Sequence, residues 1–371
     1  MAIRIGINGV GRIGRNLWRI LHTDAPDIEI VVANDTADLA TVAGLLRYDS
    51  IRGRFPATVD SVGNSIIVDG AAVPLSHCPR PEGIDWAAYG VDLVVEATGQ
   101  FTRASAARGH LAAGAPAVII STASPDADIS IMMGINEQRF CPERHRVISS
   151  SCCTTYCLAL MLNPLHQAYG VVSANATIAY SHGSRPGPLL DGVFPNLRMA
   201  RANATSIVPA NIPGIRHALD HVLPELAGRV TATALRVPVR ASSAATLTVR
   251  LDRPADPTEI NATLHAASTT LLKDYLLLSD APLVSCDVVG TPASCVVDTA
   301  LTSRLGDLVR VVGWYDNEWG YTHRLVDLIR HVALRTDRPV RVRGYGRSPE
   351  RGGARTAAPA GGPRRPCGGC D

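Results

Sequence analysis

The sequence is poor in lysine, in aromatic residues and in net charge, and it has no long apolar run. Lys273 is the only lysine, and aromatic side chains make up 5% of the 371 residues. The net charge of +3 is too small to indicate a nucleic-acid surface, which needs clustered basic charge. No apolar run reaches the roughly 20 residues that a membrane-spanning helix requires. We therefore expect neither nucleic acid nor a membrane as a partner.

The cysteines lack the pattern of a disulfide framework. Nine cysteines are an odd number, and they are scattered through apolar segments, which is typical of reduced thiols. The N-terminus enters a strand-like pattern at once, without the basic stretch and cleavage site of a secretory signal. With 46% hydrophobic and 19% charged residues, the composition is that of a globular protein. We expect a soluble, cytoplasmic protein.

The chain is long enough for two domains, and its pattern of apolar residues changes near the middle. In the first 150 or so residues, apolar runs with Val and Ile on both faces alternate with helical stretches, which predicts a doubly wound parallel sheet. These runs are 3–8, 28–33, 91–96 and 117–121. Later runs alternate apolar and polar residues and predict a mostly antiparallel sheet. They are 174–181, 230–237, 244–251 and 308–315, and a helical pattern follows at 321–334.

A glycine-rich loop follows the first predicted strand. It reads Gly9-Val10-Gly11-Arg12-Ile13-Gly14 and opens a helix, and Asp35 closes the second strand about twenty residues later. Gly9 allows a tight turn, Gly11 lets a pyrophosphate approach the backbone, and Gly14 permits close helix–strand packing. Asp35 would bind the ribose hydroxyls and repel a 2′-phosphate, so the pattern predicts NAD rather than NADP. A glycine-rich turn without function is less favoured, because three features coincide.

A pair of cysteines stands at the start of a predicted helix. Three serines at 149–151 are followed by Cys152 and Cys153 and then by an apolar helical stretch. The positive end of a helix lowers the pKa of a nearby thiol, so we expect an activated nucleophile here. The spacing alone does not choose between the two cysteines. A small buried core residue is the alternative interpretation for either one.

Several motifs then occur in a familiar order. They are the run from Ile7 to Arg15, Asn34-Asp35, Tyr48-Asp49-Ser50, Glu96-Ala97-Thr98-Gly99, Cys153-Thr154-Thr155, Leu235-Arg236-Val237-Pro238 and Trp314-Tyr315-Asp316-Asn317-Glu318. Over residues 1 to about 335 the chain resembles the phosphorylating glyceraldehyde-3-phosphate dehydrogenase family, as a divergent member. The sequence of residues 317–320 also resembles the erythrose-4-phosphate dehydrogenase branch.

The resemblance implies a fold, a reaction and a set of residue roles. It implies a Rossmann NAD-binding domain over 1–152, a catalytic α+β domain over 153–317, and a C-terminal helix within 318–338 that returns to the NAD domain. Cys153 would attack the aldehyde, and inorganic phosphate or water would release the acyl group. Asn317 and Tyr321 would lie at the nicotinamide, and Arg236 would bind a substrate phosphate. A homotetramer is implied as well.

One catalytic position departs from the family pattern. The family has a histidine in the strand after its nucleophile segment, and that histidine activates the cysteine. Counting without a gap, its position is held here by Tyr180, or by Ala179 after a slip of one residue. His182 lies two residues beyond Tyr180, on the same face if the strand continues. It is a candidate for a displaced base, or else an unrelated turn histidine.

Other departures surround the expected substrate. Cys152 and Tyr156 replace a serine and an asparagine of the family next to Thr154. One anion loop reads Gly183-Ser184-Arg185, in which Arg185 adds a positive charge, and the second ends at Gly214 after Asn211-Ile212-Pro213. Because the cofactor positions are intact, we predict NAD-dependent oxidation of a small phosphorylated or phosphonylated aldehyde. A catalytically silent NAD-binding paralogue is the alternative.

The C-terminal residues differ from the rest in composition. Residues 344–371 are rich in Gly, Pro, Arg and Ala without periodicity, which predicts a disordered tail. Cys367 and Cys370 are too few for a structural zinc site, which needs four ligands. We therefore predict no metal site.

Overall fold

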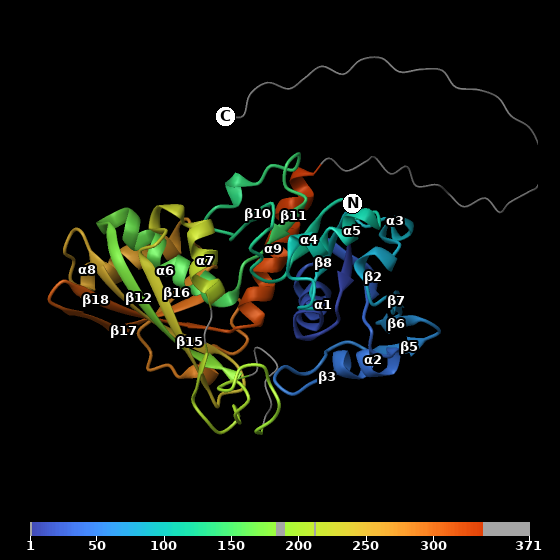
Figure 1. Ribbon diagram of the computed structural model, residues 1–371, viewed down its shortest axis with the longest axis horizontal. Coiled ribbons are helices and arrows are strands. Elements are labelled where there is room, and N and C mark those ends of the chain that lie inside the picture. The colour runs from blue at the N-terminus through green and yellow to red at the C-terminus, as the bar shows by residue number, and fades with distance from the viewer. Residues whose placement is uncertain (1, 183–189, 211–212, 337–371) are drawn as a thin grey trace, which may run out of the picture. The chain divides into compact units, whose positions relative to one another are not determined.

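The computed structural model describes residues 2–182, 190–210 and 213–336. Arg185 and the predicted tail at 344–371 lie outside the described residues. Over these ranges the chain forms two large sheets with helices packed on them (Figure 1). The α/β fold predicted from the sequence is confirmed, with a Rossmann domain followed by a second domain around a mixed sheet.

The first sheet has nine strands in the order β10-β11-β9-β8-β1-β2-β7-β6-β5. Pairing is parallel from β10 to β7, and β5, β6 and β7 pair antiparallel. The strands are β1 (Ile3–Asn8), β2 (Ile28–Asn34), β5 (Val59–Val62), β6 (Ser65–Val68), β7 (Ala71–Ser76), β8 (Leu93–Glu96), β9 (Val118–Ile120), β10 (Ile129–Ser130) and β11 (Val147–Ser149). The parallel part explains the apolar runs of the sequence, because helices cover both faces.

The helices of this half are α1 (Arg12–Asp24), α2 (Leu39–Arg47), α3 (Trp86–Tyr89), α4 (Ala104–Ala107) and α5 (Gly109–Ala112). Two short strands, β3 (Tyr48–Asp49) and β4 (Gly53–Arg54), form a separate hairpin after α2. The helix α1 begins directly after the glycine-rich loop, as a dinucleotide-binding βαβ unit requires.

The second sheet has seven strands in the order β13-β14-β12-β15-β18-β17-β16. They are β12 (Val171–Ser181), β13 (Val208–Ala210), β14 (Val230–Val237), β15 (Ser243–Leu251), β16 (Leu276–Ser279), β17 (Cys295–Leu305) and β18 (Leu308–Tyr315). Only β12–β14 and β16–β17 pair parallel, so the sheet is mostly antiparallel as predicted. The helix α6 (Cys153–Tyr169) lies against this sheet, between α7 (Pro213–Val222) and α8 (Pro257–Thr269).

The last described helix, α9 (Trp319–Arg335), packs against α1 of the first half (Figure 1). Its buried residues include the four predicted from the sequence, Leu325, Leu328, Ile329 and Val332. These side chains belong to the same apolar core as β1 and α1. The core of the first half is therefore completed by a helix that lies about 300 residues further along the chain.

A buried ion pair also joins the two halves. Arg52, between β3 and β4, donates to both carboxylate oxygens of Asp316, at 2.9 and 2.7 Å. Asp316 follows β18 and is buried, and it also accepts hydrogen bonds from the backbone N–H groups of Gly290, Glu318 and Trp319. This pair fixes the chain immediately before Asn317. Within the described ranges, no helix has the length and hydropathy of a membrane span.

Candidate active site

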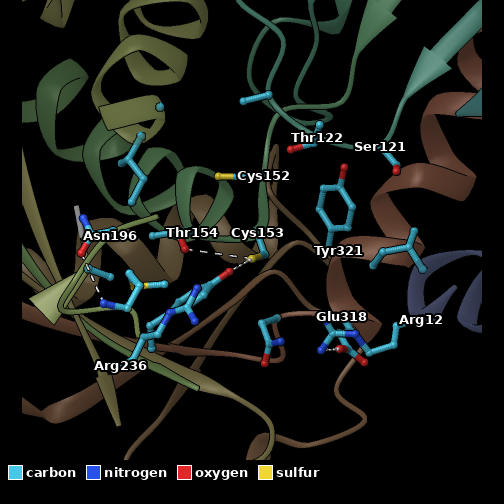
Figure 2. A pocket seen from close by; sticks show the side chains of 18 of the residues that line it. Arg12, Ser121, Thr122, Cys152, Cys153, Thr154, Asn196, Arg236, Glu318 and Tyr321 are labelled. Carbon is cyan, nitrogen blue, oxygen red and sulfur yellow. Dashed lines mark hydrogen bonds and ion pairs between the residues drawn. The ribbon is translucent and has the colours of Figure 1, made fainter. Parts of the chain in front are cut away.

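A cavity of about 540 Å³ lies where the glycine-rich loop, the start of α6, the end of β12 and the start of α9 meet. Figure 2 shows Asn196 and Arg236 on one side of Cys153, and Arg12, Glu318 and Tyr321 on the other. The described residues that line it are Arg12, Ile13, Ser121, Thr122, Ala123, Cys152, Cys153, Thr154, Tyr180, Phe194, Asn196, Met199, Ala210, Gly214, Ile215, Arg236, Asn317, Glu318 and Tyr321.

The geometry of the glycine-rich loop fits a dinucleotide. Gly9 has a φ of +97°, and a Cβ there would lie 2.6 Å from the backbone nitrogen of Thr98. A Cβ on Gly14 would lie 2.2 Å from the Gly9 carbonyl oxygen. Gly11, by contrast, faces open space, and it precedes α1 without a side-chain cap. The N–H groups at this helix end are thus accessible to a pyrophosphate, which the helix dipole also favours.

Asp35 lies beside this loop at the end of β2. Its carboxylate oxygens accept hydrogen bonds from the backbone N–H groups of Val10, at 2.8 Å, and Ala37, at 2.9 Å. The side chain remains half exposed. Each carboxylate oxygen has two lone pairs, so this position suits a ribose diol.

Three residues of the α9 junction border the cavity. Asn317 accepts hydrogen bonds through Oδ1 from the Ser242 N–H at 2.8 Å and the Ser181 hydroxyl at 3.1 Å, which orients its amide. Glu318 forms an ion pair with Arg12 of the glycine-rich loop, at 3.0 Å. Burial raises the pKa of Glu318, and the Arg12 charge acts in the opposite direction. The Tyr321 hydroxyl is hydrogen-bonded to the Ser150 hydroxyl.

Cys153 is the first residue of α6, and Cys152 is its N-cap. The chain enters this helix through Ser151, which is buried and has a φ of +58°. The Cys153 Sγ lies 3.8 Å from the Tyr180 hydroxyl and 4.0 Å from the Thr154 hydroxyl. The Cys152 Sγ instead contacts the Thr155 hydroxyl, at 3.0 Å. Both thiols line the cavity, but they have different polar neighbours.

The ionisation of Cys153 differs from the sequence-based expectation. Burial raises the pKa of the Cys153 thiol to about 12, and the neighbouring Cys152 acts in the same direction. Hydrogen bonds from Tyr180 and Thr154 lower it only in part. This direction is opposite to the lowering expected from the helix end. The physical reason is that its hydrogen-bonding neighbours are neutral hydroxyls, which do not offset the loss of water around a thiolate.

The end of β12 determines which side chain faces the nucleophile. Tyr180, and not Ala179, lines the cavity, and Tyr180 lies opposite Arg236 in the β12–β14 pairing. The strand ends at Ser181, so the alternation that would bring His182 to the same face is not continued. The backbone N–H of His182 bonds to the Val239 carbonyl, and His182 is not among the described lining residues.

The remaining candidates for substrate contacts come from separate elements. Arg236 is buried on β14, and Gly214 lies in the first turn of α7. The Thr154 hydroxyl is hydrogen-bonded to the Tyr315 hydroxyl at 2.8 Å. All three of Arg236, Gly214 and Thr154 line the cavity.

Sequence reasoning missed part of the lining. Ser121 and Thr122 follow β9, and the rule that ligands bind at the carboxyl ends of parallel strands points to them. The sequence analysis used Glu318 only as part of a family motif and did not predict that it lines the cavity. Phe194, Asn196 and Met199 come from a segment without a recognisable motif, so only the structure brings them to the cavity.

Comparisons with known proteins show a family to which the chain is similar. Residues 3–104 match the model described as "Glyceraldehyde 3-phosphate dehydrogenase, NAD binding domain" and residues 151–317 match its "C-terminal domain". The chain is 45% identical to glyceraldehyde-3-phosphate dehydrogenase 2 of Streptomyces arenae over 328 residues, which are 88% of this chain and 98% of that protein. It is 43% identical to glyceraldehyde-3-phosphate dehydrogenase of Geobacillus stearothermophilus over 334 residues, 90% of this chain and 99% of the relative.

Proposed function

The chain belongs to the glyceraldehyde-3-phosphate dehydrogenase family, and on that premise we propose that it oxidises a glyceraldehyde-3-phosphate-like aldehyde through a thioester on Cys153. It is an NAD-dependent oxidoreductase of that family. The observation that carries the proposal is the position of Cys153 at the start of α6, in one cavity with Arg236 and the glycine-rich loop.

The residues of the cavity have different roles in the proposed reaction. Cys153 adds to the carbonyl carbon, and the hemithioacetal that forms becomes a thioester when it loses a hydride from carbon and the proton of its hydroxyl group to water. The planar guanidinium of Arg236 binds a phosphate or phosphonate group through two N–H groups, which positions the aldehyde. When bound, NAD would supply the hydride acceptor. The glycine-rich loop and Asp35 would hold its phosphates and ribose, and Asn317 and Tyr321 would lie at its nicotinamide end. Inorganic phosphate or water then releases the acyl group.

Three aldehydes of this class are candidate substrates. Glyceraldehyde 3-phosphate, erythrose 4-phosphate and a phosphonate aldehyde all present one anionic group and one small aldehyde. Thr154 and Gly214 line the same cavity as Arg236, and they complete the proposed substrate contacts together with Cys152. We also include Arg185, which the sequence places in an anion loop.

A catalytically silent NAD-binding paralogue is the second candidate. The observation that favours it is the pairing of a thiol of pKa about 12 with the hydroxyl of Tyr180. A thiol of that kind is almost entirely protonated at neutral pH, and the thiolate is the more nucleophilic form. In that case no residue would act as the base.

NADH formation with a panel of phosphorylated and phosphonylated aldehydes distinguishes the two candidates. We expect NADH with at least one aldehyde, and its loss in Cys153→Ser. The matched control is Cys286→Ser, which removes an exposed thiol and should retain the activity. If the parent protein binds NAD but forms no NADH with any aldehyde at any pH tested, the silent paralogue is the correct reading.

The proposal also covers the oligomeric state of the protein and its location in the cell. We propose a homotetramer, which would cover exposed apolar side chains of the second sheet, Leu277, Leu301, Leu305 and Leu308. Sedimentation equilibrium measures the mass of the assembly, and a monomer at micromolar concentration would contradict this part. We also propose a cytoplasmic location, because the reaction needs a reduced Cys153 thiol and reducing compartments maintain one.

A further inference from the structure

We propose that Tyr180 is a catalytic proton relay, which lets a neutral Cys153 thiol add to the aldehyde without first becoming a thiolate. The inference rests on the proposed function, because it requires an aldehyde next to Cys153. It deepens that function by giving a role to the residue that stands in place of the family histidine.

The geometry that carries the inference is local. The Tyr180 hydroxyl lies 3.8 Å from the Cys153 Sγ, within hydrogen-bonding range for sulfur. Tyr180 is also the cross-strand neighbour of Arg236, and both line the cavity. One hydroxyl is therefore adjacent to the nucleophile and to the side chain that would bind the substrate anion. An aldehyde bound there would present its carbonyl group to both Cys153 and Tyr180.

Three other groups of the described lining that could transfer a proton have partners of their own. The hydroxyl of Thr154 lies 4.0 Å from the Cys153 Sγ and is hydrogen-bonded to Tyr315. The hydroxyl of Tyr321 is hydrogen-bonded to Ser150. Glu318 is paired with Arg12.

The electrostatics of the site favour a step without charged intermediates. Burial holds the pKa of Cys153 at about 12, so sulfur carries its proton at neutral pH. A thiolate and an alkoxide are both costly in a half-buried cavity without a nearby imidazolium. A mechanism in which the thiol loses its proton while the carbonyl oxygen gains one avoids both charges.

In the addition step, the Tyr180 hydroxyl accepts one proton and donates another. The S–H bond breaks and a bond forms between sulfur and the carbonyl carbon. The thiol proton passes to the Tyr180 oxygen while the Tyr180 hydroxyl proton passes to the carbonyl oxygen. The π pair of the carbonyl becomes the new O–H bond, and the pair of the S–H bond remains on sulfur. The products are a neutral hemithioacetal and an unchanged tyrosine, so no oxidant or external base is used.

The test follows the addition in the absence of NAD. Glyceraldehyde 3-phosphate carrying ¹³C at its aldehyde carbon is mixed with the full chain, and exchange NMR measures the rate of hemithioacetal formation. We expect Tyr180→Phe to slow this rate by about 10²–10⁴-fold, the usual range for general acid–base assistance. The rate in the parent should also fall in deuterium oxide, because protons move in the slow step.

A second measurement separates a relay from a structural role. Iodoacetamide reacts with the thiolate and needs no proton delivered to a carbonyl, so Tyr180→Phe should retain most of the parent alkylation rate at alkaline pH. The matched control is Tyr169→Phe at the opposite end of α6, where the hydroxyl bonds to Thr263. It should form the adduct at the parent rate.

The outcomes are distinct. Equal adduct rates in the parent and Tyr180→Phe, or equal losses of adduct formation and alkylation, would overturn the relay. Absence of any adduct in the parent would overturn it as well. An adduct that forms through Tyr180 but yields no NADH when NAD is added leaves the relay standing and overturns the dehydrogenase function.

Discussion

Cys153 and Tyr180 form a neutral pair at a position where the family resemblance implies a cysteine and an imidazole. Their contact is 3.8 Å, and burial raises the pKa of the thiol to about 12. Burial is the largest cause of this rise, and the hydrogen bond with Tyr180 acts against it. We expect an imidazole at position 180 to favour the thiolate more strongly than this hydroxyl does.

Tyr180→His should shift the ionisation of Cys153 to lower pH. An imidazolium beside the sulfur favours the charged thiolate, which lowers the thiol pKa. In the parent, alkylation should rise with pH throughout pH 7–10, because the whole range lies below the pKa of about 12. In the variant, the rise should begin at lower pH, with a rate at pH 7 at least about tenfold higher. Iodoacetamide kinetics against pH measure both profiles.

His182→Ala provides the comparison for that variant. If His182 acts as a displaced base, its removal abolishes activity and changes the pH profile, and Tyr180→His adds little. We expect the profile of His182→Ala to match the parent, since the described cavity does not include His182. A profile unchanged by both substitutions would contradict the assignment of Tyr180 to the base position.

Asp35→Ala should relax the preference for NAD over NADP. The carboxylate loses its hydrogen bonds to the ribose, and a 2′-phosphate is no longer repelled, so the affinity ratio should fall by about tenfold or more. Titration calorimetry with both dinucleotides gives the ratio. The matched control is Asp38→Ala, which removes the N-cap of α2 three residues away and should lower stability but leave the ratio unchanged. Equal affinities in the parent would contradict the role of Asp35.

Residue patterns located some functional side chains and not others, for physical reasons. Asp35 is fixed by its spacing from the glycine loop, so the sequence pattern reveals it. Spacing also marks the helix start at the two cysteines, but only the family resemblance chooses Cys153 over Cys152. Asn196 and Glu318 reach the cavity through long-range folding, and local periodicity carries no information on such contacts. The pKa of Cys153 depends on burial, which the sequence does not quantify.

At the scale of elements, the first turn of α1 depends on two glycines in different ways. A Cβ on Gly14 would lie 2.2 Å from the Gly9 carbonyl, whereas Gly11 has open space around it. Gly14→Ala should therefore displace α1 and cost at least about 1–3 kcal/mol of folding free energy. Urea unfolding measures this loss, and NAD affinity should fall with it.

Gly11→Ala is the matched control for that element. Its methyl group meets no protein atom, so stability should change by about 1 kcal/mol or less. NAD affinity should still fall, because the methyl group occupies the path of the pyrophosphate. If both variants lose the same stability, the contact between Gly14 and Gly9 does not control the packing of α1.

The elements were predictable in part: of the described strands, eight overlap a predicted run and ten do not. Three strands, β1, β14 and β18, match their predicted ranges, because each has a clear apolar pattern bounded by polar or turn residues. The strands β5 and β6 were not predicted, since short amphipathic hairpins at a sheet edge leave a weak pattern. The predicted run 174–181 ends at Ser181, as β12 does, so the strand does not continue to His182 as a displaced base on the same face would require.

At the scale of the whole molecule, Arg52 and Asp316 connect the NAD-binding half to the segment that carries Asn317. Both side chains are buried, at 8% and 0% relative exposure. The guanidinium also lies over the ring of Trp319, 5.0 Å from its centroid. This cluster holds the start of α9 against the hairpin β3–β4, so a change there should affect both stability and NAD binding.

Arg52→Ala leaves the Asp316 carboxylate buried without its cation. Loss of one partner of a buried pair costs about 3–5 kcal/mol, and we expect the lower end because three backbone N–H groups still reach Asp316. NAD affinity should also decrease. The control is Arg80→Ala, which breaks an exposed pair with Glu82 and should change stability by less than about 0.5 kcal/mol. Equal urea midpoints for the two variants would refute a connecting role.

The place of α9 also bears on how the chain is made. During translation, β1 and α1 leave the ribosome long before α9, which is complete only at residue 335. The NAD-binding half therefore lacks the helix that covers its core during most of synthesis. During that interval apolar side chains of the sheet and of α1 remain open to water and to other chains. We therefore expect chaperones to bind incomplete chains. A gene cut before α9 should yield aggregates rather than a small NAD-binding fragment.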